Sequence, residues 1–118
     1  MEEIISILMN DAELSQYTIK PFGQLPIGKG ITYDFNTVSS NGIKAQDRLT
    51  VTAVSYSITE SLRILRRIKQ LLLTIGDTPL SDKVLKVVQN GGGSANNVVD
   101  GKNMYPFTAI FYITRRES

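Results

Sequence analysis

Residues 46–76, QDRLTVTAVSYSITESLRILRRIKQLLLTIG, contain the pattern that decides the fold of this chain. From Gln46 through Ser57 the side chains alternate, and we expect one face of this segment to carry Leu49, Val51 and Ala53. The opposite face would carry Thr50, Thr52 and Val54. Because a period of two is typical of a strand with one buried face, this half of the stretch is predicted to be a β-strand.

The second half of the stretch predicts the clearest helix in the chain. Its apolar residues recur at the spacing of one buried helical face, and they are Ile64, Leu65, Ile68, Leu71, Leu72 and Ile75. Ser57 and Glu60 have the spacing of a capping box, with Thr59 as a rival N-cap. Gly76 stands where a left-handed C-cap is expected.

Upstream of the stretch, a short helix, a loop and a second strand are predicted. Residues 2–9 carry apolar side chains at helical spacing. Residues 18–30 are rich in proline and glycine and are expected to form a loop. Residues 31–36 alternate, which predicts a half-buried strand, and Asn41-Gly42 favours a hairpin turn between this strand and the next.

Downstream, two more strands are predicted on either side of a flexible connection. Residues 84–88 are rich in valine, and residues 90–97 hold a glycine run that suggests a long hairpin loop or a mobile flap. The final strand, about residues 104–115, has large apolar side chains on both faces. We expect it either to be central and covered twice or to lie against a partner subunit.

These elements follow one another in the order α-β-β-α-β-β. We predict a single α+β domain over residues 1–118, with a mostly antiparallel four-stranded sheet. One long helix would pack on a face of this sheet, together with a short N-terminal helix.

The composition excludes several classes of function. The chain has no His and no Cys, so it lacks the residues for a Cys- or His-based zinc site, a Ser-His-Asp triad, a Cys-His dyad or a disulfide. Its 13 Lys and Arg residues against 11 Asp and Glu residues give a net charge of +2. Dedicated nucleic-acid binders usually concentrate more charge on one face. The acidic start and the short apolar runs lead us to expect a soluble, cytoplasmic domain that is not associated with a membrane.

No group of titratable residues predicts catalysis. No two carboxylates share one face of a regular element beside a basic partner, as an acid–base pair would require. The Gly28-Lys29-Gly30 and Gly101-Lys102 segments lack the spacing of a phosphate-binding loop. We therefore expect no enzymatic activity and no catalytic, metal or cofactor site.

The basic residues allow three interpretations. Arg63, Arg66 and Arg67 share one face of the predicted helix, which is most simply a solvated face. Alternatively, the cluster would face a neighbouring subunit, or this cluster and the C-terminal strand would form a small nucleic-acid-binding domain. No ribonucleoprotein motif accompanies the aromatic stripe of that strand, and such a stripe is usually core.

One set of phrases goes beyond general patterning. The segment GIKAQDRL, residues 42–49, is followed by a strand rich in Thr and Val and then by the long helix. LTIGD at 73–77, VQNGGGS at 88–94, and a closing strand that ends in Arg115-Arg116 continue the pattern. This arrangement resembles the small neck and tail-completion proteins of tailed bacteriophages and prophages over about residues 30–116.

The resemblance implies a tail terminator or head-to-tail joining protein, which is not an enzyme. Such proteins assemble as rings, typically hexameric, that cap the tail tube, end its polymerisation and join it to the head connector. The implied partners are further copies of the chain, the tail tube protein, the head connector or neck proteins, and the sheath terminus in a contractile tail. Genomic DNA would pass through the lumen without specific binding. The implied location is the tail or neck of the virion, after assembly in the cytoplasm of the host bacterium.

The residues expected to make these contacts lie in the polar loops, the helix and the chain end. They are Ile43, Lys44, Gln46, Arg48, Arg63, Arg66, Arg67, Asn90, Arg115 and Arg116. We expect the loops at 39–46 and 90–102 to become ordered only when they meet the tube or the connector.

Overall fold

The computed structural model describes residues 2–21, 30–73, 80, 84–94, 97–99 and 102–116. In chain order, its elements are α1 (Glu2–Asn10), β1 (Thr18–Pro21), β2 (Gly30–Ser40), β3 (Lys44–Val54), α2 (Ile58–Leu72), β4 (Val84–Ser94), β5 (Asn97–Val99), β6 (Lys102–Met104) and β7 (Phe107–Arg116).

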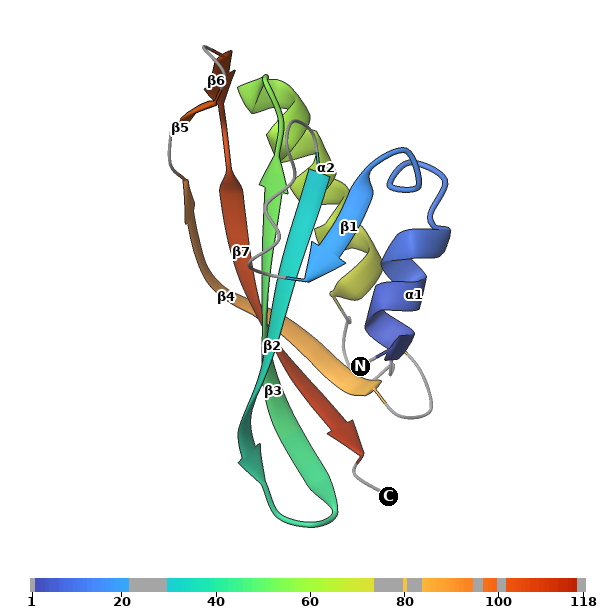
Figure 1. Ribbon diagram of the computed structural model, residues 1–118. Coiled ribbons are helices and arrows are strands. Elements are labelled where there is room, and N and C mark those ends of the chain that lie inside the picture. The colour runs from blue at the N-terminus through green and yellow to red at the C-terminus, as the bar shows by residue number, and fades with distance from the viewer. Residues whose placement is uncertain are drawn as a thin grey trace.

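The main sheet has five strands in the order β1-β2-β3-β7-β4. β1 pairs with β2 in parallel, whereas the other three pairings are antiparallel. β5 and β6 form a separate two-stranded ladder. Both helices lie on the same side of the main sheet (Figure 1), which therefore has one face under helices and one face without them.

The hydrophobic core lies between the helices and the sheet. The central strands supply alternate residues to it, and those from β3 and β7 are Leu49, Val51, Ala53, Ala109, Phe111 and Ile113. Helices α1 and α2 supply Ile4, Leu8, Ile64, Leu65, Ile68 and Leu72. This confirms the predicted buried face of the strand at 46–57 and the apolar face of α2.

The start of α2 confirms the predicted N-cap. Ser57 has extended backbone dihedral angles, and its side chain accepts a hydrogen bond from the backbone N–H of Glu60 at 3.4 Å. The helix ends at Leu72, and the backbone N–H of Leu73 donates to the carbonyl of Lys69. The predicted C-cap at Gly76 lies outside the described residues.

The hairpin between β2 and β3 also forms where Asn41-Gly42 predicted it. Gly42 has a φ of +86°, which an L side chain rarely adopts, and the Asn41 carboxamide oxygen accepts from the backbone N–H groups of Ile43 and Lys44 at 2.9 and 2.7 Å. The strands reach closer to the turn than expected, because β2 continues to Ser40 and β3 begins at Lys44. The predicted long loop at 39–46 is therefore a tight turn between paired strands.

The predicted fold class is wrong. Instead of four strands in the order α-β-β-α-β-β, the described residues contain a mixed sheet of five strands, a separate two-stranded ladder and two helices of 9 and 15 residues. One cause is β1, which falls in the segment predicted to be a loop. Its four residues, TIKP, are too few to show a period, and Pro21 is tolerated because β1 is an edge strand.

The second cause is the glycine run, which was predicted to be a flexible connection and instead extends β4. Gly92 pairs with Ala109 and has a φ of +155°. A Cβ atom at Gly92 would lie 2.5 Å from the backbone oxygen of Thr108, so glycine is what lets the two strands lie this close. Composition suggested flexibility here, whereas these glycines allow a close approach between strands.

Candidate functional site

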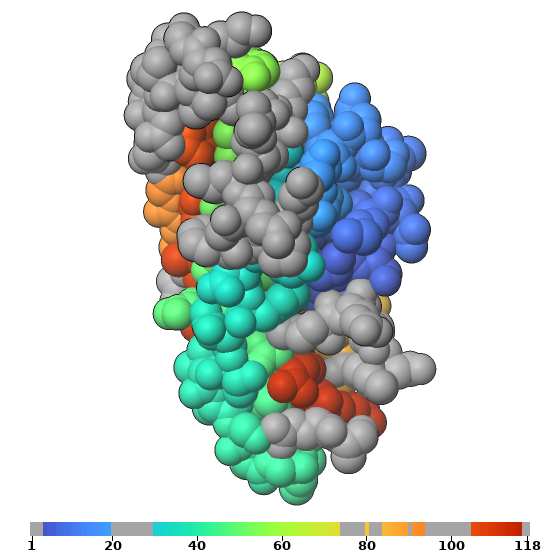
Figure 2. Space-filling view, in the orientation of Figure 1, coloured from blue at the N-terminus to red at the C-terminus, as the bar shows by residue number. Residues whose placement is uncertain are grey.

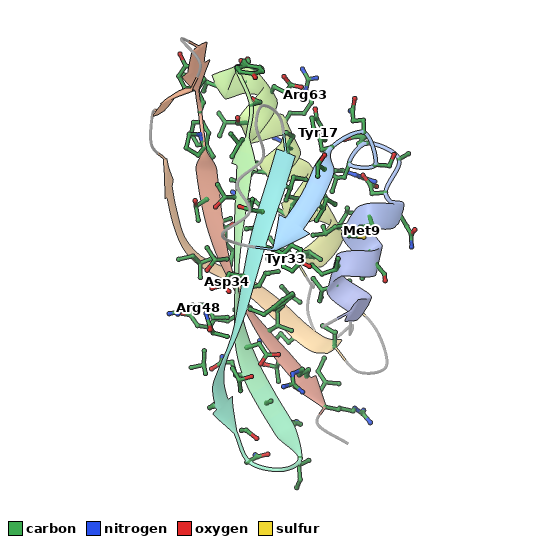
Figure 3. The ribbon with its side chains drawn as sticks, in the orientation of Figure 1. Met9, Tyr17, Tyr33, Asp34, Arg48 and Arg63 are labelled. Atoms are coloured by element: carbon green, nitrogen blue, oxygen red, sulfur yellow. The ribbon has the colours of Figure 1, made fainter. Side chains whose placement is uncertain are left out.

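The face of the sheet opposite the helices carries most of the features expected of a contact surface. We call it the helix-free face and define it by the pairing register. It comprises Asp34 and Asn36 of β2, Lys44 to Thr50 at even positions of β3, Thr108 to Arg116 at even positions of β7, and Lys86 and Val88 of β4. Thr32, Thr52 and Val54 lie on the same side of the sheet but are buried, so they are not part of the face. In Figure 3, Asp34 and Arg48 point away from the helices, whereas Tyr33 points toward them.

An apolar strip occupies the centre of this face. Tyr112 is paired with Val88 on one side and with Arg48 on the other, and Ile110 is its neighbour along β7. Tyr112 and Ile110 are half-buried, and Val88 is 40% exposed. Apolar side chains that stay partly exposed on a sheet face, with polar groups around them, are typical of protein–protein contact surfaces.

Positive charge lies beside the apolar strip and between it and the β2–β3 turn. Lys44, Arg48, Lys86 and Arg116 are all exposed on this face, and Lys44 lies directly opposite Arg116 in the register. Among the described residues of the face, Asp34 is the one carboxylate, and it accepts from the Asn36 amide at 3.0 Å. The helix-free face is therefore markedly more cationic than the net charge of +2 for the whole chain suggests.

The end of the β2–β3 hairpin adjoins this face and is also exposed. Figure 1 shows that the hairpin extends past both helices, and Figure 2 shows it forming one end of the molecule. Ile43 in the turn is 70% exposed and Val38 near it is 51% exposed. A shallow cavity of about 230 Å³ lies beside the turn, lined by residues that include Ser39, Lys44 and Thr114.

The structure brings four of the ten predicted contact residues together on one face. Lys44, Gln46, Arg48 and Arg116 lie on the helix-free face, and Ile43 lies in the adjoining turn. Sequence reasoning did not include Val88, Ile110 and Tyr112 among the contact residues. The available signal was the pair of apolar faces on the final strand.

The other predicted residues lie elsewhere. Arg115 is on the helix side of the sheet, where its Nε donates to Asp47, whose carboxylate is 1% exposed. This ion pair joins β7 to β3, because the two residues come from those neighbouring strands. Asn90 lies in β4, and Arg63, Arg66 and Arg67 lie on α2, across the sheet from the helix-free face.

The turn after α1 is held against α2 at two points. The Asp11 carboxylate accepts from Arg67 Nη2 at 2.6 Å and from Arg67 Nε at 3.1 Å, and it also caps the turn by accepting from the backbone N–H of Leu14. At the other end, the Tyr17 hydroxyl donates to Glu60 at 2.9 Å. Burial and this hydrogen bond raise the pKa of Tyr17 above its ordinary value.

The Asp11–Arg67 ion pair makes the stability of the fold depend on pH in the acid range. The hydrogen bond from Arg67 lowers the pKa of Asp11 below its ordinary value of 3.8. A depressed carboxyl pKa contributes stability that is fully present above the ordinary value and is lost as the pH falls through the lowered one. We predict that Asp11→Asn, which keeps an oxygen for the turn, lowers the melting temperature at neutral pH.

Thermal melts followed from neutral pH into acid test this prediction. The difference between the parent chain and Asp11→Asn should begin to shrink below about pH 4, where Asp11 of the unfolded chain is protonated, and should vanish once the pH falls below the lowered pKa of the folded chain. Glu13→Gln is the matched control, since Glu13 is 63% exposed and lies 3.9 Å from Arg67 Nε. A difference that stays constant into acid would contradict the ion-pair origin of the effect.

Two further features, a carboxylate metal site and a membrane-spanning helix, are absent from the described part of the chain. No group of three or more carboxylates there could hold a metal ion. No helix in those same residues is long and apolar enough to cross a membrane.

Comparison with known proteins finds similarity among solved structures. No model of a protein family matches the chain, and no curated protein matches it. Among solved structures, the chain is similar to one in the virion of a native gene transfer agent (GTA) particle, with a TM-score of 0.69 and 12% sequence identity. The similarity covers 96% of this chain and 91% of that one. At this identity it shows a shared fold.

The geometry also bears on the nucleic-acid interpretation. Phe111 is fully buried and Phe107 packs against the core, so the aromatic stripe of the final strand has no exposed ring at Phe111 for a base to stack on. The arginines of α2 lie on the opposite side of the sheet from Tyr112. The strand and the arginine cluster therefore do not form one continuous surface.

Proposed function

We propose that this chain is a structural subunit of a phage-like virion. The observation that carries the proposal is the fold, which matches a chain of the GTA virion over nearly the full length of both. Shared fold alone does not determine function, so the role is our inference. The motifs at 42–49 and 88–94, which resemble neck and tail-completion proteins, support the same role independently.

We further propose that the subunit forms a ring at the tail neck and has no enzymatic activity. In this role the ring caps the tail tube, ends its polymerisation and joins it to the head connector. A ring closes through heterologous contacts, in which one surface of a subunit meets a different surface of the next. The helix-free face suits one half of such a contact, because it combines a partly exposed apolar strip with a charged border.

The oligomeric state of the purified chain tests this proposal. Native mass spectrometry at low and moderate salt, with and without a short DNA duplex, should give one discrete oligomer whose size does not depend on DNA. Electron microscopy of the same sample should show closed rings. A monomer that binds DNA and is released as salt rises would overturn the proposal in favour of a nucleic-acid-binding domain. A monomer under every condition would contradict self-assembly in solution.

The hairpin end gives a second test. Ile43→Asp should leave the fold intact, because the turn is held by the Asn41 side chain and by Gly42, and Ile43 itself is 70% exposed. Substitutions at such surface positions usually change stability by less than about 0.5 kcal/mol. We predict a folded chain whose ring formation is impaired, measured by native mass spectrometry beside a thermal melt.

Thr59→Asp is the control for this variant, since it adds the same charge at an exposed position in the first turn of α2. It should melt and assemble like the parent chain. Rings that form normally from Ile43→Asp would rule out a contact at the hairpin end. Unfolding of Ile43→Asp would contradict the exposed position of the turn.

A further inference from the structure

A pocket of about 390 Å³ lies on the helix side of the molecule, away from the helix-free face. It is formed between the turn after α1 and one side of α2, and it opens to solvent. The polar side chains around it include Gln16 and Tyr17 from the turn and Arg63, Arg66, Arg67 and Gln70 from α2. Figure 3 shows Tyr17 and Arg63 close together beside α2.

The turn that forms one wall of this pocket is already held in place by contacts within the chain. Asp11 holds Arg67 at one end, and Glu60 holds Tyr17 at the other. Leu14, between these points, is buried in the core with 1% exposure. Because both ends and the middle of the turn are anchored, the turn itself needs little ordering when a ligand enters, and the side chains that must become ordered are those of Arg63 and Arg66.

The charge of the pocket is only partly neutralised. Arg67 is paired with Asp11, and its Nη1 donates to Gln70 at 3.3 Å. Arg63 and Arg66 are exposed, and the described residues provide neither of them with an ion partner. Glu13, with 63% of its side chain exposed, is the one carboxylate in the lining. Two guanidinium groups thus remain available for an anion.

We propose that this pocket binds carboxylate side chains of an acidic segment from a neighbouring protein of the particle. Guanidinium groups bind carboxylates in bidentate geometry, and such charge-assisted hydrogen bonds are about twice as strong as neutral ones. The neighbouring protein is inferred from the proposed function, whereas the anion preference is inferred from the pocket itself.

A protein carboxylate fits the pocket better than a DNA backbone does. Duplex DNA presents one charge per about 1.7 Å along its axis, and its binders neutralise many phosphates over an extended cationic surface. Here the two free guanidinium groups, those of Arg63 and Arg66, border one recess of about 390 Å³ instead of an extended cationic surface. One or two carboxylates need only the two free arginines.

The test uses the full chain and a tetraglutamate peptide with blocked ends as the probe. Isothermal titration calorimetry should show saturable binding. Arg63→Gln with Arg66→Gln should weaken it by at least about tenfold, as expected for the loss of charge-assisted hydrogen bonds. Glutamine is a good helix former, so α2 should persist, which circular dichroism checks. Glu13→Gln should tighten binding, because it removes the one opposing carboxylate in the lining.

Arg48→Gln with Lys86→Gln is the matched control, since it removes two exposed positive charges from the opposite side of the sheet. It should leave peptide binding within about twofold of the parent, because charges separated by more than about 10 Å are largely screened at moderate salt. Equal weakening by both double variants, or no peptide binding at all, would overturn the proposal. A short duplex that binds more tightly than the peptide through Arg63 and Arg66 would also overturn it, in favour of a nucleic-acid contact.

These outcomes are separable from those for the proposed function. A chain that binds the peptide but forms no ring would contradict the ring and leave the pocket standing. A chain that forms rings but ignores the peptide would overturn the pocket alone.

Discussion

Phe111→Asp should leave the chain unable to fold. Phe111 is fully buried in the middle of β7, with Leu49 of β3 and Gln89 of β4 as its register partners. Removing a buried phenylalanine side chain costs about 3–5 kcal/mol, and an unpaired buried carboxylate costs several more. Their sum is comparable to the whole stability of a typical domain, about 5–15 kcal/mol. Circular dichroism of the purified variant should show no cooperative thermal transition.

Phe111→Leu is the control for this experiment. It keeps an apolar side chain of similar reach, so the chain should still fold and melt cooperatively at a lower temperature. A cooperative transition for Phe111→Asp would mean that the side chain at this position reaches solvent, and the assignment of the two faces of β7 would then be wrong.

The elements that sequence patterns predicted correctly are those fixed by neighbours along the chain. The Ser57 N-cap needs only Glu60, three residues away, and the turn at Asn41-Gly42 is held by hydrogen bonds within four residues. The buried faces of β3 and α2 repeat with their own periods, which a short window of sequence reveals.

The features that were missed depend on partners far away in the chain. β1 is a strand because its four residues pair with β2, and nothing within the sequence TIKP requires a strand. The glycines of β4 could equally belong to a loop until β7 is placed against them. Strand order is decided by such pairings, so a local reading does not determine it.

In the candidate site, too, features fixed by nearby residues were predicted and features fixed by distant ones were not. Lys44, Gln46 and Arg48 were identified from one phrase, and their shared face follows from alternation within β3. Arg116 lies on the same face as these residues, whereas Arg115 lies on the other face and pairs with the buried Asp47. This difference depends on the register between β3 and β7. Apolar side chains on both faces of β7 were visible in the sequence, but only the sheet order reveals which face stays partly exposed.

Tyr112→Asp should produce a folded chain that no longer forms rings. Tyr112 is adjacent to Phe111 but points to the helix-free face, where it is half-buried between Val88 and Arg48. A half-exposed strand position tolerates a carboxylate at a cost of about 1 kcal/mol, which lowers the melting temperature by about 4–8 °C. Aromatic anchors at the centre of an interface are often worth about 2 kcal/mol or more each.

The effect on assembly should be larger than the free-energy cost at a single interface, because every interface of a closed ring repeats the same substitution. Native mass spectrometry should therefore show monomer where the parent chain gives the oligomer, with a thermal melt confirming the fold. Tyr112→Phe should assemble like the parent, because it keeps the aromatic side chain at the centre of the apolar strip. If Tyr112→Asp still formed rings, the contact between subunits would have to lie elsewhere than on the helix-free face. The same substitution at two adjacent residues, blocking folding at Phe111 and assembly at Tyr112, would assign different roles to the two faces of a single strand.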